Sequence, residues 1–441
     1  MAERIRKVRV ATVLIWGSEV GAVSWDNDRG YGTFEYEPAF VRRGLEIAPL
    51  TLPLRSGLFS FPALNRDTFH GLPGMLADAL PDSFGNRIID LWLARQGRAP
   101  GDFTPVERLC YMGARCMGAL EFKPTIGTQA RKTEPIEVSE LTQLATDILR
   151  RSTEWAVHLK GEKARALGTI IRIGTSAGGK RAKAVIAWNP KTHEVRSGQV
   201  PPPPGFEPWI LKFDGVNEAS LGDPQGFGRV EYAYHRMAAA AGIRMMPCRL
   251  LEENGRAHFM TRRFDRTFDG GKIHMQSLCA LAHCDFNAAG EYGYEQALSV
   301  IQQLNLGHPT MQEMFRRMTF NVVARNQDDH TRNIAFLMDQ NGAWTLSPAF
   351  DVVWAYNPSG EWTNRHQMSI NGKRDDFTKA DTLSVAKQFG IKGAEGILSQ
   401  VIDAVARWPE FANEAGVPED LMKQIAPTHR LIPVIAGTHQ L

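Results

Sequence analysis

Alternating apolar and polar positions dominate the start of the chain. The runs VRVATVLIW and VGAVSWD have the period of two that is typical of half-buried strands, and together they predict a β-hairpin. The run YGTFEYEPAFV predicts a further strand. A stretch rich in turn residues follows, from Leu52 to Gly85. The first hundred residues are therefore expected to be rich in β-structure.

Helical spacing begins after this stretch. In NRIIDLWLARQGR, the apolar residues recur at steps of three and four, which places Ile88, Leu91, Trp92 and Ala94 on one side of a helix. The run TPVERLCYMGARCMGALEF predicts a helix that ends at a glycine. Residues 134–150 predict another helix, with Ser139 as its N-cap.

The second half of the chain changes from strand to helix patterns. PWILKF predicts a short strand, and GRVEYAYHRMAAAAGI predicts a helix. CRLLEENGRAHFMTRRFD predicts a hairpin because Asn254-Gly255 supplies a two-residue turn between strand-like runs. From Met275 to Leu431 the pattern is mostly helical.

These patterns predict an α+β protein with more than one domain, as expected for 441 residues. We expect a β-rich N-terminal subdomain at residues 1–160 and a bilobed domain at residues 161–441. Within the second domain, a β-rich lobe would extend to about residue 270 and a mostly α-helical lobe would cover residues 271–441.

Composition narrows the class of protein. The 51 basic and 48 acidic residues leave a net charge of +3, whereas a dedicated nucleic-acid-binding protein usually has a strong basic excess. The five cysteines are odd in number and lack C-x-x-C spacing, which favours a reducing cytoplasm over a disulfide framework or a structural zinc site. No segment reaches the roughly 18 apolar residues of a membrane-spanning helix, so no membrane association is expected.

The densest polar cluster is RNQDDHTRN, which stands directly before an apolar run. Asp328 and Asn333 are five positions apart, and Asp351 follows in LSPAFD. Phosphoryl transfer requires an acceptor for the proton of the attacking hydroxyl and oxygen ligands for magnesium, which D-x-x-x-x-N followed by a second Asp would supply. Asp328 would then be the catalytic base, and Asn333 and Asp351 the metal ligands. The alternative is that these residues are loop caps and turn formers.

A glycine-rich loop lies upstream, in IGTSAGGKRAKA. Gly174, Gly178 and Gly179 would let backbone N–H groups approach a phosphate, and Lys183 would contribute positive charge together with Lys180 and Arg181. The loop does not match G-x-x-x-x-G-K-[ST], so a standard P-loop is rejected. A glycine-rich hairpin turn is the alternative explanation.

Two further features complete the order of parts in a kinase. Lys212 lies in the apolar run PWILKF, from which it could reach nucleotide phosphates and pair with Glu231 of the next helix. A solvent-facing strand lysine is the alternative. The hairpin that ends in FMTRRFD suits a hinge whose backbone binds adenine. The order of these parts along the chain is thus the order that kinases show: glycine loop, lysine, helix glutamate, hinge, D-x-x-x-x-N and Asp.

Several segments together resemble the HipA family, whose members are serine/threonine-kinase toxins of bacterial toxin–antitoxin pairs. The resemblance covers nearly the whole chain. It rests on LPGMLADALPDSFGNRII and MGARCMGALEF in the first part, and on GTSAGGKRAKA, ILKF, RRFDR, HMQSLCAL, RNQDDHTRN and LSPAFD in the second.

The resemblance implies a protein-kinase-like fold and ATP and magnesium as cofactors. It implies that Ser176 is autophosphorylated, although Thr175 is an adjacent hydroxyl, and that Lys212 contacts the phosphates. Arg263 and Phe264 would lie at the nucleotide hinge, where Arg262 replaces an acidic residue of some members. His330 would support the nucleotide site in a structural role.

The resemblance also implies partners. These are a HipB-like helix-turn-helix antitoxin, operator DNA contacted mainly through that antitoxin, and a protein substrate such as glutamate–tRNA ligase, whose phosphorylation would inhibit translation. Two other functions stay open from the residues. One is a small-molecule kinase of the aminoglycoside- or choline-kinase type, and the other is an inactive kinase-like module that assembles with an antitoxin on DNA.

Overall fold

The computed structural model of the chain describes residues 7–127, 135–150, 182–216 and 226–431. These residues form two units that alternate along the chain. The first unit contains residues up to Gln225, Arg249–Gln276 and Met338–Ala343, and the second contains Gly226–Cys248, Ser277–Leu337 and the residues from Trp344 onward. The domain boundary predicted at residue 160 lies outside the described residues.

The first unit begins with a five-stranded sheet of order β4-β3-β2-β1-β5. In β1, the alternate residues Ala11, Val13 and Ile15 are fully buried, so the period of two in the sequence corresponds to one face packed on the core. The predicted hairpin is confirmed, because β1 and β2 pair antiparallel, and β3 adds to β2 as expected. The strands of this sheet are β1 (Val10–Ile15), β2 (Ser18–Asp26), β3 (Tyr31–Tyr36), β4 (Leu58–Phe59) and β5 (Leu120–Lys123).

The first unit also contains helices. The predicted helix at Ile88–Ala94 is confirmed, but it begins earlier, because Asp82 caps it by accepting a hydrogen bond from the Gly85 N–H at 2.6 Å. The predicted helix in TPVERLCYMG is confirmed and ends at a glycine, Gly113, but the rest of the run is not helical and contains strand β5. The prediction of Ser139 as an N-cap is wrong, because Ser139 lies inside a helix that begins at Val138. The helices are α1 (Pro38–Arg43), α2 (Arg66–Phe69), α3 (Gly74–Ala77), α4 (Ser83–Arg95), α5 (Pro105–Met112), α6 (Val138–Arg150) and the 3₁₀ turn η1 (Pro100–Asp102).

The second sheet of the first unit has the order β7-β6-β8-β10-β9. All six residues of β6 are buried, as expected for a continuous apolar run in an inner strand. The predicted hairpin is confirmed: Asn254 and Gly255 adopt φ values of 46° and 75°, which the twist of a two-residue β-turn requires. The strands are β6 (Lys183–Trp188), β7 (Val195–Ser197), β8 (Glu207–Lys212), β9 (Cys248–Glu253) and β10 (Arg256–Arg262), and β11 (His274–Ser277) ends at the border of the two units along the chain.

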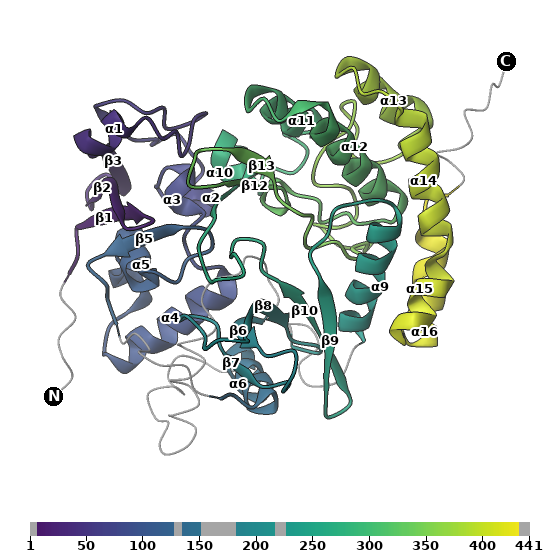
Figure 1. Cartoon of the computed structure of the whole chain (residues 1–441), viewed down its shortest axis with the longest axis horizontal. Coiled ribbons are helices and arrows are strands. Elements are labelled where there is room, and N and C mark those ends of the chain that lie inside the picture. The colour runs from purple at the N-terminus through teal and green to yellow at the C-terminus, as the bar shows by residue number, and fades with distance from the viewer. Residues whose placement is uncertain (1–6, 128–134, 151–181, 217–225, 432–441) are drawn as a thin grey trace. The chain divides into compact units, whose positions relative to one another are not determined.

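The second unit is mainly helical. Helix α9, which carries the predicted apolar side Val230, Tyr234 and Met237, packs beside α14 and α15 (Figure 1). The prediction of a mostly helical segment after Met275 misses a long irregular region between α12 and α13, in which β12 pairs with β13. The elements are α9 (Phe227–Ala240), α10 (Leu278–Ala282), α11 (Tyr294–Gln303), α12 (Gly307–Val323), η2 (Thr331–Asn333), β12 (Ala335–Met338), β13 (Trp344–Leu346), α13 (Lys379–Gln388), α14 (Ala394–Ala406), α15 (Trp408–Ala415), α16 (Glu419–Ile425) and η3 (Ala426–Thr428).

The α+β class predicted from the sequence is confirmed, with the β-rich region in the N-terminal part of the chain. None of the five cysteines, all of which lie among the described residues, forms a disulfide. Among the residues that the structure describes, no helix is long and apolar enough to cross a membrane.

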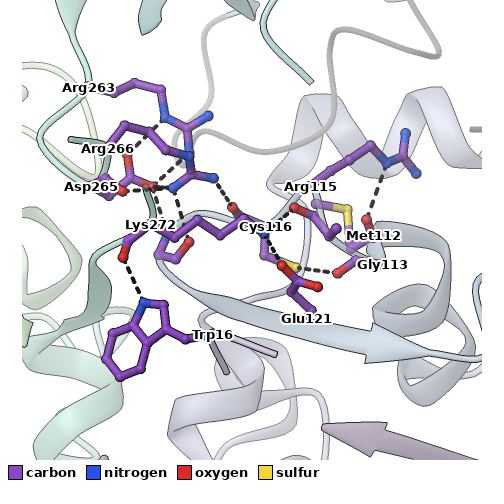
Figure 2. Close-up of polar contacts among 12 residues, drawn as sticks. Trp16, Met112, Gly113, Arg115, Cys116, Glu121, Arg263, Asp265, Arg266 and Lys272 are labelled. Atoms are coloured by element: carbon purple, nitrogen blue, oxygen red, sulfur yellow. Dashed lines mark hydrogen bonds and ion pairs between the residues drawn. The ribbon is translucent and has the colours of Figure 1, made fainter. Parts of the chain in front are cut away.

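A buried carboxylate joins the two β-rich parts of the first unit (Figure 2). Asp265, directly after β10, is completely buried and accepts hydrogen bonds from Arg263 at 2.7 and 2.8 Å and from Arg266 at 2.7 Å. It also accepts a 2.7 Å hydrogen bond from the backbone N–H of Gly118, which lies just before β5. Burial raises the pKa of Asp265, but the two guanidinium groups and the Gly118 N–H lower it well below its ordinary value.

A second set of contacts supports the same joint. The Lys272 ammonium donates to the Glu121 carboxylate and to the Ala114 carbonyl, both at 2.7 Å, while the Lys272 carbonyl accepts from the Trp16 indole at 2.7 Å (Figure 2). The hairpin that follows β10 is therefore fixed by charge to the N-terminal sheet of the same unit.

We predict that Asp265→Asn destabilises the protein at neutral pH, by about 3–5 kcal/mol, because it leaves two buried guanidinium groups without their counter-ion. The pKa of Asp265 is lowered in the folded state, so its contribution is present above the ordinary Asp pKa of about 4 and is lost as the pH falls below it. Urea denaturation at several pH values should show a gap between wild type and variant that is largest above about pH 5 and shrinks in acid.

Asp269→Asn is the matched control, because Asp269 is an exposed carboxylate in the same hairpin. It should change the free energy of unfolding much less. A gap for Asp265→Asn that is independent of pH, or no larger than that of the control, would contradict the role given to Asp265.

Candidate active site

The predicted catalytic loop leaves α12 through a residue in the left-handed region, Arg325, with φ of 56°. Two backbone hydrogen bonds hold its first part to Ala355: the Gln327 N–H donates to the Ala355 carbonyl, and the Ala355 N–H donates to the Arg325 carbonyl, both at 3.1 Å. The end of the loop is fixed by a 2.7 Å hydrogen bond from the Thr331 hydroxyl to the Cys284 carbonyl. The loop is thus anchored at both ends within the second unit.

Asp329 points into the core of this unit. It is 3% exposed and accepts three hydrogen bonds of 2.8 Å, from the Tyr294 hydroxyl, the His366 Nδ1 and the Gln367 backbone N–H. Burial raises its pKa, but the electrostatic effect and hydrogen bond of His366, together with the other two donors, lower the pKa below its ordinary value. These three hydrogen bonds connect the loop to Tyr294, His366 and Gln367.

Asp328 has the opposite environment. Its side chain is 42% exposed. One carboxylate oxygen accepts a 2.5 Å hydrogen bond from the Trp362 indole and lies 3.8 Å from His330 Nε2. A carboxylate that is held from one side and open to solvent on the other can receive the proton of an incoming hydroxyl. Asp328 is therefore accessible to a substrate whereas Asp329 is not, and the role of Asp328 as the catalytic base stays a prediction.

Asn333 and His330 lie beside Asp328. The Asn333 amide nitrogen donates to the Asp328 backbone carbonyl at 2.8 Å, which turns the loop back on itself across the predicted five-residue spacing. His330 is packed between the rings of Phe286 and Trp362, with centroids 5.4 and 6.2 Å away. This placement is consistent with the structural role expected for His330.

Asp351 belongs to the same electrostatic environment. Burial lowers the pKa of His330, and the negative charges of Asp328 and Asp351 oppose that shift. Asp351 adopts φ of 52°, a left-handed conformation that Asp and Asn adopt more readily than most other residues. The second unit therefore brings together all of the predicted residues Asp328, Asn333, His330 and Asp351.

The oxygen atoms of this cluster fit a magnesium ion. Magnesium binds hard oxygen ligands and is usually held by one or two carboxylates together with nucleotide phosphates and water. Within the described ranges, no group of three or more His, Cys, Asp or Glu side chains could hold a metal ion. The prediction that Asn333 and Asp351 hold magnesium together with a nucleotide stays a prediction.

The predicted phosphate-contacting lysines lie in the first unit. Lys183 of β6 and Lys212 of β8 are directly opposite in the antiparallel register, so both side chains leave the same face of the sheet. Lys183 is 5% exposed and lies 3.9 Å from the carboxylate of Asp82. The Asp82 carboxylate offsets the charge of Lys183, so contact of Lys183 and Lys212 with phosphates stays a prediction. The pairing of Lys212 with Glu231, a buried residue of α9 in the second unit, stays a prediction.

The hinge residues are only partly available for a nucleotide. The Arg263 side chain is 2% exposed and is committed to Asp265, and its backbone N–H donates to the Pro208 carbonyl at 3.0 Å. Phe264 is half-buried. Gly174, Ser176, Gly178 and Gly179 of the predicted phosphate loop lie outside the described residues.

Sequence reasoning missed the residues that hold the two aspartates. Tyr294, Trp362 and His366 lie 37 positions or fewer from Asp329, yet none of them belongs to a recognisable motif. The sequence indicates only that a buried aspartate needs hydrogen-bond donors, because burying a carboxylate without them is unfavourable. It does not identify which residues donate.

Two family models match this chain. The model described as HipA-like C-terminal domain matches residues 175–425, and the model described as HipA N-terminal domain matches residues 11–123. A curated protein named "Putative kinase Y4mE", from Sinorhizobium fredii, is 24% identical over 230 residues, which cover 50% of this chain and 46% of that protein. The chain therefore spans about half the length of the curated relative that it matches.

A solved structure from Shewanella oneidensis MR-1 has a similar fold. It is the complex of HipA, HipB and operator DNA from a toxin–antitoxin system. The similarity covers 95% of this chain and 94% of that one, with a TM-score of 0.65 and 17% sequence identity. At this identity the likeness establishes the fold.

We predict that the two adjacent aspartates differ in their effect on folding. Asp329→Asn replaces an acceptor that faces three donors with an amide that must point its own N–H groups at one of them, and it should lower the free energy of unfolding by about 3 kcal/mol or more. Asp328→Asn keeps an oxygen for the Trp362 indole and should change it by less than about 0.5 kcal/mol. Urea denaturation of both variants measures the difference, and equal effects would contradict the division of roles.

Proposed function

The chain belongs to the HipA family, and from this premise we propose that it is an ATP- and magnesium-dependent serine/threonine protein kinase. The single observation that carries the proposal is the pair of adjacent carboxylates in the second unit. Asp329 is buried on three hydrogen-bond donors, whereas Asp328 is 42% exposed beside Asn333. One aspartate thus fixes the loop and leaves the other free for chemistry.

In this proposal each group has one task. A substrate hydroxyl attacks the γ-phosphorus of ATP, the bond from that phosphorus to the β–γ bridging oxygen breaks, and ADP leaves. Asp328 orients the hydroxyl and accepts its proton. Lys212 and Lys183 contact the phosphates, and the hinge at Arg263 and Phe264 contacts adenine through its backbone. Magnesium, when bound through Asn333 and Asp351, would neutralise charge that develops on the phosphates.

The partners are proposed from the family. The Shewanella protein with this fold was solved with HipB and operator DNA. We propose that this chain likewise assembles with a HipB-like helix-turn-helix antitoxin and reaches operator DNA mainly through it, which suits its net charge of +3. Its toxic action would be phosphorylation of a protein of translation, such as glutamate–tRNA ligase.

Ser176 is proposed as the site of autophosphorylation. A phosphate there would add about −1.5 to −2 charges at neutral pH to the loop expected to receive the phosphates of ATP. Repulsion would weaken nucleotide binding, so that autophosphorylation would switch the enzyme off.

We predict that the wild-type protein, incubated with magnesium and ATP labelled on the γ-phosphate, transfers label to Ser176. Asp328→Asn should reduce transfer by a factor of roughly 10² or more while ATP binding is largely kept, because the shape of the side chain remains and its charge is removed. Scintillation counting and mass spectrometry give the rate and the site.

Parallel reactions separate the other functions. Label transferred to an aminoglycoside or to choline, with none on protein, would indicate a small-molecule kinase. Absence of transfer to any acceptor, with intact binding of a HipB-like protein, would indicate an inactive module. Near-wild-type transfer by Asp328→Asn would show that the base is another residue.

We also predict that Asp351→Ala weakens binding of magnesium–ATP more than it weakens folding, because it removes a proposed metal ligand. The rise in melting temperature on addition of magnesium and ATP should shrink, since stabilisation by a ligand follows its affinity. The melting temperature without nucleotide is the internal control. An unchanged magnesium-dependent shift would place the metal elsewhere.

A further inference from the structure

The segment that follows α16 is hydrogen-bonded to two of the three residues that lead into the catalytic loop, and Tyr234 connects it to the third. The Arg430 backbone N–H donates to the Val323 carbonyl at 2.9 Å, and the Thr428 carbonyl accepts from Arg325 Nε at 2.9 Å. Between them, the Tyr234 hydroxyl lies 2.7 Å from the Ala324 carbonyl and 2.9 Å from His429 Nε2. We call residues 426–430 the C-terminal strap.

The strap carries a buried cation toward the loop. Arg430 is 7% exposed, forms an ion pair with Asp375, and lies with its Nη1 3.5 Å from Nε2 of His366. A guanidinium can only donate, so Nε2 of His366 is the acceptor in this contact. The other ring nitrogen, Nδ1, is 2.8 Å from the Asp329 carboxylate and is the donor there. Arg430, His366 and Asp329 therefore form one directed chain of hydrogen bonds.

The chain ends one residue from the proposed base. Because Asp329 and Asp328 are adjacent, the position of the Asp329 carboxylate fixes the peptide from which the Asp328 side chain projects. Burial lowers the pKa of Arg430. The guanidinium is held by its ion pair with Asp375 and lies over the ring of Phe377, 5.4 Å from the ring centroid.

We infer that the C-terminal strap sets the geometry of the catalytic loop, and that Arg430 is a positioning residue that acts on Asp328 through His366 and Asp329. The part of this inference that concerns catalysis by Asp328 rests on the proposed function. It assigns to the end of the described chain a task at the active site that no motif in the sequence indicates.

The first test compares Arg430→Met with Arg407→Met in the full-length protein. Methionine keeps an unbranched apolar stem but removes the guanidinium, and Arg407 is a control because its ion pair with Glu410 is half-exposed. Arg430→Met should lower kcat for phosphate transfer by about tenfold or more and leave the KM for ATP within about twofold, since orientation of the base matters in the transition state. Arg407→Met should change neither value.

A double-mutant cycle tests the route through His366. In His366→Asn, the amide nitrogen can replace Nδ1 as donor to Asp329, but the acceptor that faces Arg430 is lost. If Arg430 acts through this imidazole, Arg430→Met should cause little further loss of kcat in the His366→Asn background. Full additivity of the two substitutions would overturn the proposed route.

Hydrogen exchange gives a readout that does not depend on activity. Peptides that cover residues 324–334 should exchange at least about tenfold faster in Arg430→Met than in wild type, while peptides of α14 stay unchanged. The inference would be overturned if exchange became faster uniformly across the second unit, or if exchange in the loop peptides did not become faster. The first of these results would make Arg430 a residue that contributes to general stability. Faster exchange confined to the loop in a protein that transfers no phosphate would support the strap and reject the proposed kinase function.

Discussion

The buried carboxylate of Asp329 is the interaction on which the active-site region depends. A charge in the core must be fully hydrogen-bonded or it destabilises the fold. Asp329 meets this requirement with donors from the start of α11 and from the irregular segment near residue 366, which are distant in sequence. These hydrogen bonds connect the loop to two other segments of the second unit. The neighbouring Asp328 remains exposed.

A related device occurs in the first unit. Asp265 uses the same principle, a buried carboxylate with several donors, to join the second sheet to the N-terminal sheet. In both places a short acidic side chain connects segments that are far apart in the sequence. The difference lies in the partners: two guanidinium groups surround Asp265, whereas neutral hydroxyl and amide groups and an imidazole surround Asp329. The first arrangement serves the assembly of two sheets, and the second serves the placement of a neighbouring side chain.

Sequence reasoning succeeded where local chemistry determines structure. The Asn254-Gly255 turn, the alternating strands at the N-terminus and the close approach of Asn333 to Asp328 all follow from short-range patterns. It failed where the outcome depends on tertiary context. Ser139 is a good N-cap residue by type, but the helix begins one residue earlier, and the irregular region between α12 and α13 was read as helix. His366 and Arg430 could not be selected as partners of the loop, because any buried donor would satisfy the same energetic need.

The central claim is that two neighbouring carboxylates divide the work, one for structure and one for chemistry. A crystal structure of the protein with magnesium and a non-hydrolysable ATP analogue tests this claim most directly. The account predicts that magnesium binds Asn333 and Asp351, that Asp328 faces the γ-phosphate, and that Asp329 keeps its contacts with Tyr294, His366 and Gln367. A γ-phosphate placed at Asp329, or a metal ion bound away from Asn333 and Asp351, would contradict it.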